Sequence, residues 1–327
     1  MWQKRFLAAF VLAATLLTVL LAGFYVRDYS AGRKEGKKKF GAIYMTMNNP
    51  FYRTMDLALR QSIEAKDDIL LCRDAALSPE RQREEAEALI EEGCAVLFLN
   101  AVDERAAADI VRIAERKGVL VIAVDTRIEG AAPPVTVTSS NYETGKSLAT
   151  HLLSVRTSAN IVLLEHDEAA SARERIQGFL DGIAGRDGFL VVGRRPCYGQ
   201  LEKAMPQMEV LLREHPELDV VVALNDPAAM GAIAALEHAQ RLENTLVYGV
   251  DGVPEARELV RSGRLTATAE QDPREMARLA AQEAYRLLEK AGQQATLPSV
   301  GAPALHELPT RLLTLETVER GGADRWE

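Results

Sequence analysis

At 327 residues the chain is long enough for two ordinary domains. Apolar residues make up 47% and charged residues 26%, which is typical of globular proteins and excludes wholesale disorder. Residues 1–39 carry 8 of the 39 Lys and Arg residues and 2 of the 47 Asp and Glu residues, so the remainder has 31 basic and 45 acidic residues and a charge near −14. This acidity excludes binding to a nucleic-acid backbone as the main role of the chain.

The chain opens with an apolar segment, residues 6–26, that contains no charged side chain. As a helix, this segment would reach about 31 Å, enough to cross the hydrocarbon core of a membrane. It is longer than the apolar region of a typical signal peptide, and the nearest small-residue pair, Ser30 and Ala31, lies beyond two charged residues. We therefore predict that residues 1–26 form an uncleaved signal anchor, a transmembrane helix, with cleavage as the alternative.

A basic linker, residues 27–39, follows the apolar segment. Basic flanks tend to stay in the cytoplasm, so this linker favours the orientation opposite to the one that an extracytoplasmic domain needs. The linker could also contact anionic lipid head groups, although a solvated linker is the simpler interpretation. The sequence leaves the orientation open at this point.

From residue 40 onward, short β-rich runs alternate with amphipathic helical stretches. Most of the runs are continuously apolar, which is typical of parallel strands buried on both faces. The expected strands are residues 40–45, 69–72, 95–99, 119–124, 161–164, 190–192, 220–224 and 246–250. Three helices have readable starts, because Ser78, Asp226 and Asp272 each stand as a capping residue directly before a proline. The alternation predicts an α/β fold with parallel sheets.

These strand–helix units are too many for one small sheet, so we predict two Rossmann-like lobes with a break near residues 139–141. Ligands of open α/β sheets bind beyond the carboxyl ends of the strands. Polar and aromatic residues follow the expected strands there, namely residues 48–52, Asn100, Asp125, Asn225, Asp226 and Asp251. A lone strand-end Asp is commonly a turn or cap residue, but the clusters together predict a polar binding site.

Six stretches of the body share a pattern with a known family. They are residues 47–52 (MNNPFY), 122–125 (IAVD), 171–179 (SARERIQGF), 223–226 (ALND), 249–252 (GVDG) and 269–271 (AEQ). In this order and spacing the chain resembles the type I periplasmic sugar-binding proteins, especially the ribose-binding group, which shares its fold with the ligand-binding half of lactose-repressor-type regulators. The resemblance runs from about residue 40 to the C-terminus.

The resemblance implies that binding residues come from both lobes. Asn49 corresponds to an amide that hydrogen-bonds sugar hydroxyls, and Phe51 and Tyr52 correspond to aromatic residues that sandwich the sugar ring. Asp125 corresponds to a carboxylate that accepts from vicinal hydroxyls, and Arg175 to a guanidinium of the second lobe. The other polar groups of the second lobe and hinge are Asn225, Asp251 and Gln271. Sugars suit this set, because they offer C–H faces to aromatic rings and hydroxyls to carboxylates, amides and arginine.

Several departures from the family pattern mark further possible ligand-binding residues. The family has Arg directly after the strand-end Asp, whereas this chain has Thr126 and then Arg127. Met45 replaces a small polar residue, and Gly199 replaces a third aromatic ring, with Tyr198 one place away. Sites built around particular hydroxyls reject analogues that lack them, so these changes alter the expected ligand. A pentose or hexose is the expected class, with a non-sugar ligand as the alternative.

Simpler interpretations exist for several of these residues. Asn49 could serve only as a helix cap, the two aromatic residues could pack in the core, and Arg175 could be a solvated helix residue. We interpret Arg173 as a surface or packing arginine. No metal-like spacing links the cysteines or histidines, so we expect no metal and no cofactor, buried free thiols, and surface or core histidines. The residues concerned are Cys72, Cys94, Cys197, His151, His166 and His238.

The resemblance implies three chain crossovers, near residues 139, 271 and 300. The N-terminal lobe would comprise residues 40–139 and 272–300, and the C-terminal lobe residues 140–271 and 301–327. Hinge closure would trap the ligand between the lobes. An ABC permease with its ATPase would recognise the closed surface, with a chemoreceptor or a sensor histidine kinase as the alternative partner. The expected form is a monomer anchored in the cell membrane with its binding domain outside the cytoplasm.

Two other functional classes are disfavoured. A transcription regulator with the same ligand domain needs a helix-turn-helix before the first lobe, where this chain has the apolar segment and the basic linker. An enzyme is not expected, because the sequence has no Gly-x-Gly-x-x-Gly motif, Walker loop or Gly-x-Ser-x-Gly motif. We therefore name no catalytic residue and predict a binding protein for a small sugar-like ligand.

Overall fold

The computed structural model describes residues 36–292, 302–318 and 326, together with residues 15, 17–19 and 21. Residues 39–327 belong to one compact unit. Within the described part of the chain, no helix has both the length and the apolar character that a membrane span requires. Most of the predicted signal anchor lies outside the described residues.

Strands and helices alternate along the body in the predicted manner. The first part contains β1 (Lys39–Tyr44), α2 (Pro50–Glu64), β2 (Ile69–Asp74), α3 (Pro79–Glu91), β3 (Cys94–Leu99), α4 (Ala107–Arg116), β4 (Leu120–Asp125) and β5 (Val135–Ser139). The second contains α5 (Asn141–Val155), β6 (Ala159–Glu165), α6 (Ala170–Ile183), β7 (Phe189–Pro196), α7 (Leu201–Glu214), β8 (Val220–Ala223), α8 (Asp226–His238), a 3₁₀ turn (Leu242–Asn244), β9 (Leu246–Asp251), α9 (Pro254–Arg261) and β10 (Ala267–Glu270). The last contains α10 (Pro273–Gly292), β11 (Ala304–Leu308), β12 (Arg311–Thr314) and α11 (Leu315–Val318).

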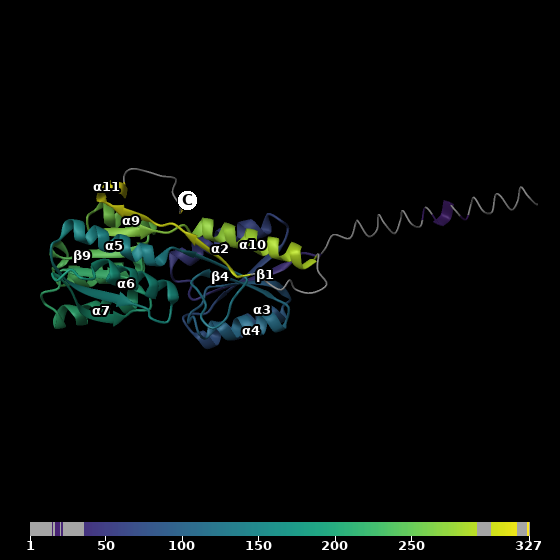
Figure 1. The fold of residues 1–327 in the computed structure, drawn as a ribbon, viewed down its shortest axis with the longest axis horizontal. Coiled ribbons are helices and arrows are strands. Elements are labelled where there is room, and N and C mark those ends of the chain that lie inside the picture. Colours follow the sequence, from purple (N-terminus) through teal and green to yellow (C-terminus); the bar gives the residue numbers. More distant parts are fainter. Residues whose placement is uncertain are drawn as a thin grey trace, which may run out of the picture. The chain divides into compact units, whose positions relative to one another are not determined.

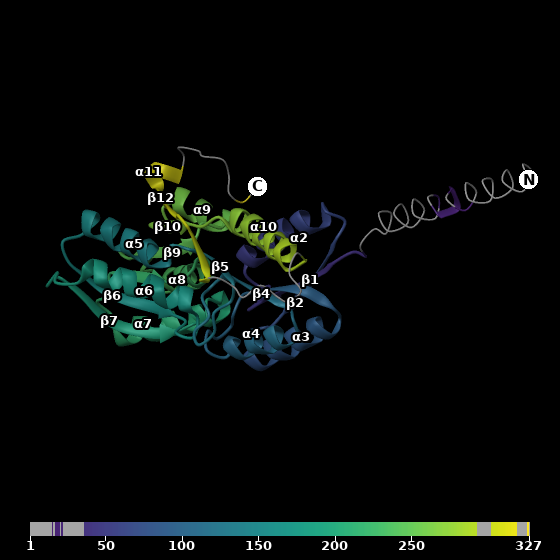
Figure 2. The same cartoon turned by 45° about the vertical axis from the view of Figure 1, so that its right-hand side comes forward.

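The strands form two sheets, one in each lobe. The first sheet has the order β11-β5-β4-β3-β1-β2 and is parallel. The second has the order β12-β10-β9-β8-β6-β7, in which β12 runs antiparallel to β10. Helices α2 and α10 cover one face of the first sheet and α3 and α4 the other, while α5 and α6 lie opposite α7 and α8 on the second (Figure 1, Figure 2). The predicted α/β fold with two parallel-sheet lobes is confirmed.

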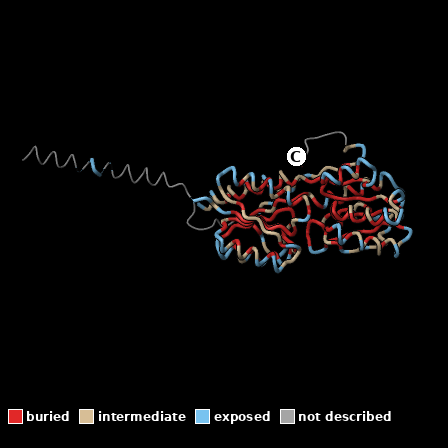
Figure 3. Tube along the Cα trace, turned by 180° about the vertical axis from the view of Figure 1, so that it is seen from behind, coloured by how far each residue is buried: buried red, intermediate tan, exposed pale blue. Residues whose placement is uncertain are grey.

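Buried strands lie at the centre of each lobe, beneath more exposed helices (Figure 3). In β6, Ile161 and Leu163 pack with residues of α5 and α6, whereas Val162 and Leu164 pack with residues of α7 and α8. The alternation arises because successive side chains of a strand point to opposite faces of the sheet. A continuous apolar run therefore supplies both helix layers.

Capping side chains fix where several helices begin. Asn49, Ser78 and Asp272 accept hydrogen bonds from backbone amides in the first turns of α2, α3 and α10. The predicted cap at Asp226 is wrong by one residue, because Asn225 caps α8 and Asp226 begins it. The buried carboxylate of Asp226 instead accepts hydrogen bonds from a threonine hydroxyl of β10 and a backbone amide that follows β9.

The chain crosses between the lobes after β5, after β10 and after β11. The third crossover, predicted near residue 300, follows Leu308. The predicted assignment of residues 301–327 to the C-terminal lobe is wrong for β11, which pairs with β5 along Ala304–Leu308 in the N-terminal sheet. This pairing covers the backbone of β5, which would otherwise be an exposed edge strand.

Glycines allow α5 and α6 to pack closely. A Cβ atom at Gly145 would lie 1.9 Å from the carbonyl oxygen of Arg175, and one at Gly178 would lie 2.0 Å from the carbonyl oxygen of Tyr142. Carbon and oxygen atoms cannot approach so closely, so this packing requires a residue without a Cβ at both positions. The contact fixes the position of α6, which carries Arg175.

Gly178→Ala should lower the free energy of unfolding by about 1–3 kcal/mol, because the added methyl group meets backbone atoms and forces α5 and α6 apart. Urea denaturation of the full chain measures this change. Gly292→Ala is the control, since a Cβ there meets no atom of the described residues within 4 Å. Equal loss of stability in the two variants would contradict the packing argument.

Candidate ligand-binding site

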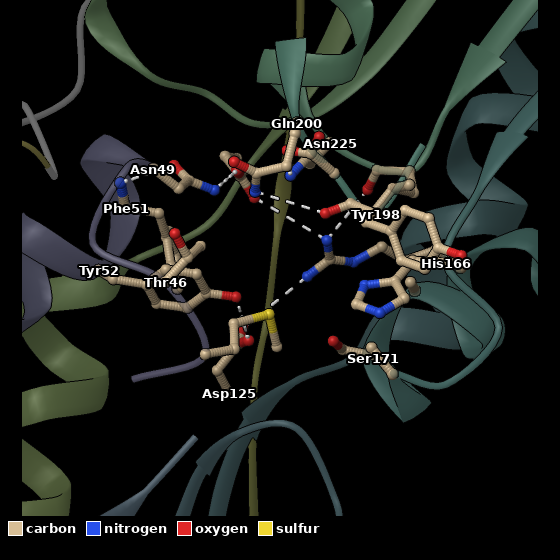
Figure 4. A pocket seen from close by; sticks show the side chains of 17 residues that line it. Thr46, Asn49, Phe51, Tyr52, Asp125, His166, Ser171, Tyr198, Gln200 and Asn225 are labelled. Carbon is tan, nitrogen blue, oxygen red and sulfur yellow. Dashed lines mark hydrogen bonds and ion pairs between the residues drawn. The ribbon is translucent and has the colours of Figure 1, made fainter. Parts of the chain in front are cut away.

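A cavity of about 20 Å³ lies where the carboxyl ends of strands from both lobes face one another, with space for about one water molecule. Side chains from both lobes line it (Figure 4). They are Met45, Thr46, Asn49, Phe51, Tyr52 and Asp125 from the first lobe and His166, Ala169, Ser171, Ala172, Arg175, Tyr198, Gly199, Gln200, Leu224, Asn225 and Asp251 from the second. A hydrogen bond and an ion pair join the two lobes at this cavity.

Asn49 joins the two lobes as well as capping α2. Its side-chain oxygen accepts a hydrogen bond from the Phe51 amide at 2.9 Å, and its Nδ2 donates to Oδ2 of Asp251, in the other lobe, at 3.2 Å. Asn49 is therefore a helix cap, but not only a cap, because the two ends of its amide make different hydrogen bonds.

Two adjacent aromatic residues form one wall of the cavity. Phe51 and Tyr52 are both buried and meet edge to face, with ring centroids 5.4 Å apart. Tyr52 donates its hydroxyl to Oδ2 of Asp125 at 3.2 Å, and Phe51 is backed by Trp326, whose ring centroid lies 6.1 Å away. The two rings are thus both core residues and part of the cavity lining.

Asp125 is held at the end of β4 in an unusual conformation. Its φ is +66°, and the amide of Thr126 donates to the carbonyl of Val124 at 2.8 Å, the i→i+2 bond of a γ-turn. Tyr52 and Asn100 donate to its Oδ2. Burial raises the pKa of Asp125, while the charge of Arg175 and these two hydrogen bonds lower it. Such strain persists where the surrounding structure fixes it, which is common at functional sites.

Arg175 lies at the centre of the site and is buried, so its interpretation as a solvated helix residue is wrong. Its Nε donates to Asn141 at 2.8 Å and its Nη1 to the carbonyl of Leu224 at 3.1 Å. The guanidinium lies 4.0 Å from a carboxylate oxygen of Asp125 and 3.9 Å from one of Asp251. These two carboxylates come from different lobes, so the guanidinium links the lobes electrostatically.

Asp251 ends β9 with a φ of +126°. Burial raises its pKa to about 6, which Arg175 and a hydrogen bond from Asn49 oppose. Gln271 donates its Nε2 to Asp251 Oδ1 at 2.7 Å but is absent from the cavity lining. Gln271 therefore helps to hold the Asp251 side chain in place, and its predicted contact with a ligand stays a prediction.

The positions that depart from the family pattern divide into two groups. Met45 and Tyr198 line the cavity, and a Cβ atom at Gly199 would lie 2.6 Å from the Asn225 side chain, so a ring has no room there. Thr126 and Arg127 are absent from the lining, because the γ-turn at the preceding residue directs the chain away from the cavity.

Four polar residues of the lining were not predicted as site residues from the sequence, namely Thr46, His166, Ser171 and Gln200. His166 is buried, and its ring packs edge-on against Tyr198 with centroids 5.3 Å apart. Burial lowers the pKa of His166, against the opposing charge of Glu168. His166 and Gln200 follow β6 and β7, so their places after strands were the signal that could have found them.

The sequence profile of the periplasmic binding protein domain matches residues 40–294. The chain belongs to this family. It is 30% identical to the ribose import binding protein of Bacillus subtilis over 265 residues, which cover 80% of this chain and 86% of that protein.

Solved structures of other family members are also similar. An ABC transporter solute-binding protein from Mycobacterium smegmatis with bound glycerol has a TM-score of 0.79 at 28% identity, covering 88% of this chain and 98% of that one. One from Bacillus halodurans with bound myo-inositol has a TM-score of 0.76 at 25% identity, with 88% and 98% coverage.

In this periplasmic binding protein, Asp251 should make stability depend on pH. Because its folded pKa of about 6 exceeds the value of about 4 in an unfolded chain, the folded protein binds the proton more tightly between pH 4 and 6. Stability from this group therefore falls as the pH rises through that window. Relative to Asp251→Asn, the wild type should lose about 1–3 kcal/mol of unfolding free energy between pH 4 and 6.5.

Urea denaturation at a series of pH values measures this difference. Asp187→Asn, at an exposed position, is the control and should follow the wild type at every pH. A constant difference between the wild type and Asp251→Asn across the window would contradict the account.

Proposed function

We propose that this protein is an extracytoplasmic substrate-binding protein that captures a small sugar-like ligand by lobe closure and presents it to an ABC transporter. The observation that carries the proposal is the convergence of carboxylates from the two lobes, Asp125 and Asp251, on the buried guanidinium of Arg175. A ligand that contacts these groups touches both lobes at once, so its binding energy favours the closed form.

The chemistry of the cavity suits a polyhydroxylated ligand. Carboxylates accept from hydroxyl groups, a guanidinium donates to them, and amides do both. The rings of Phe51 and Tyr52 offer apolar surface to the C–H face of a sugar. We assign direct ligand contact to Asn49, Phe51, Tyr52, Asp125, Arg175, Asn225 and Asp251, with Met45 and Tyr198 shaping the pocket.

The relatives support this ligand class and the transport role. The Bacillus subtilis relative is named a ribose import binding protein, and the two similar structures were solved with glycerol and myo-inositol. All three ligands carry several hydroxyl groups, which favours a sugar or polyol over a non-sugar ligand. Named import proteins also favour transport over the alternative of a sensor, and binding over turnover.

A screen by thermal unfolding of the full chain tests the proposal, with D-ribose, D-allose, myo-inositol and glycerol as probes. A probe at 100 times its dissociation constant should stabilise the wild type by about 2.7 kcal/mol. Asp125→Ala and Arg175→Ala should abolish this shift, because each removes a charged side chain of the cavity lining to which we assign direct ligand contact.

The control variant is Asp109→Ala, on the exposed face of α4. It should keep the full ligand-induced shift. If no polyol stabilises the wild type, or if the two pocket variants respond as the wild type does, the proposed function is wrong.

We further propose that the protein acts as a monomer held in the cell membrane by residues 1–26, with its body outside the cytoplasm. The charge-free run of residues 6–26 supports the anchor, while the basic linker after it opposes this orientation. A transport role requires the body outside, where the ligand is collected.

Membrane fractionation tests the anchor. The full chain expressed in a Gram-negative host should sediment with membranes and resist extraction by alkaline carbonate. Protease added to spheroplasts should digest the body, whereas a cytoplasmic marker protein should survive. A shortened N-terminus, with the body released into the soluble periplasmic fraction, would show that the segment is cleaved. Protection of the body from protease would show that it lies in the cytoplasm.

A further inference from the structure

Three consecutive residues at the start of α6 contact the opposite lobe with alternating charge. The last of the three, Arg175, faces Asp125 inside the cavity. The other two, Arg173 and Glu174, lie outside the cavity lining. They make ion pairs of their own with the first lobe, and these pairs have no part in the proposed contacts to ligand.

The first outer pair joins Arg173 to Glu104. An Nη2 of Arg173 lies 2.7 Å from the Glu104 carboxylate, whose side chain is only 5% exposed. Beside this pair, the backbone amide of Glu104 donates to the carbonyl of Glu168, across the lobes, at 3.1 Å. Arg173 is exposed, as expected of a surface arginine, and it also pairs across the lobes.

The second outer pair joins Glu174 to Arg127. The Nε of Arg127 lies 3.0 Å from the Glu174 carboxylate, and its Nη2 lies 2.7 Å from Glu307 of β11, in its own lobe. Glu307 thereby holds Arg127 toward α6. Next to this pair, the amide of Ser171 donates to the hydroxyl of Thr126 across the lobes at 3.2 Å. Thr126 and Arg127 thus both contact the second lobe outside the cavity.

We infer that Glu104, Arg127, Arg173 and Glu174 form a rim latch, a set of positioning residues that stabilises the closed lobes independently of which ligand is bound. Successive helical residues point about 100° apart. The pairs Glu104–Arg173 and Arg127–Glu174 therefore contact α6 on two sides of Arg175. The glycine contact with α5 keeps this helix in place on its own lobe.

This inference rests on the proposed function only for its effect on ligand affinity. If closure precedes or accompanies binding, the apparent dissociation constant rises in inverse proportion to the closed population. Loss of one partly exposed ion pair changes such a population by about twofold to fivefold. Every ligand of the site should weaken by the same factor, because the latch touches none of them.

Amide hydrogen exchange of the full chain in buffer without sugar tests the latch directly. The amides of Glu104 and Ser171 make hydrogen bonds across the lobes, so they exchange when the lobes part. Arg173→Met and Glu174→Gln should each speed exchange in peptides that contain these amides by about twofold to fivefold. The double variant should exchange faster than either single variant, and exchange in the core strand β9 should stay unchanged.

Arg195→Met is the matched control. Arg195 lies 2.7 Å from Glu214 of the same lobe, and the side chains are 36% and 46% exposed. This variant removes an ion pair without crossing the lobes, so it should leave the two amides unchanged. Unaltered exchange in Arg173→Met and Glu174→Gln, or equal acceleration in the control and in β9, would overturn the latch.

A second arm uses D-ribose and myo-inositol as ligands, measured by calorimetric titration. The double variant should weaken both by the same factor and leave their affinity ratio unchanged. A changed ratio would mean that these residues select the ligand and would overturn the inference. If neither probe binds the wild type, the proposed sugar-binding function fails for these probes, and the exchange measurement still decides the latch.

Discussion

The electrostatic contact of one buried guanidinium with carboxylates from two lobes is the interaction on which the site depends. Arg175 is buried beside Asp125 and Asp251, and each of these charges would be costly in the interior without the others. The carboxylates stand at the ends of β4 and β9 with positive φ angles, so the sheets present them at the cleft. Lobe closure brings the three charges together.

Surrounding residues hold these three charged side chains in position. Asn100 and Gln271 donate hydrogen bonds to the two carboxylates, and the Asn49 amide donates one to Asp251 across the lobes. The glycines of α5 and α6 fix the helix that carries Arg175. Among the described residues that line the cavity, the charged acidic and basic groups are two carboxylates, Asp125 and Asp251, and one guanidinium, Arg175. Neutral hydroxyl groups, which donate to carboxylates, fit that balance better than an anionic ligand does.

The sequence predicted the fold and the site best where a residue pattern has a single physical explanation. Continuous apolar runs predicted the buried parallel strands. Polar and aromatic residues after them predicted six of the 17 lining residues, namely Asn49, Phe51, Tyr52, Asp125, Asn225 and Asp251. Short strands with mixed side chains, such as β10 and β12, carry too weak a periodic signal to be recognised alone. The γ-turn at Asp125 directs Thr126 and Arg127 away from the cavity. This backbone conformation cannot be predicted from the residue types alone. His166 was missed because an isolated histidine has several equivalent explanations.

A crystal structure of the full chain with the polyol that binds it most tightly would show whether both lobes hold the ligand. We expect one ligand molecule between the lobes, with its hydroxyls within hydrogen-bond distance of Asp125, Asp251 and Arg175 and a C–H face against the ring of Phe51 or Tyr52. The direct bond from Asn49 to Asp251 should lengthen or be replaced by ligand contacts. A ligand bound elsewhere, or one that touches a single lobe, would contradict capture by closure.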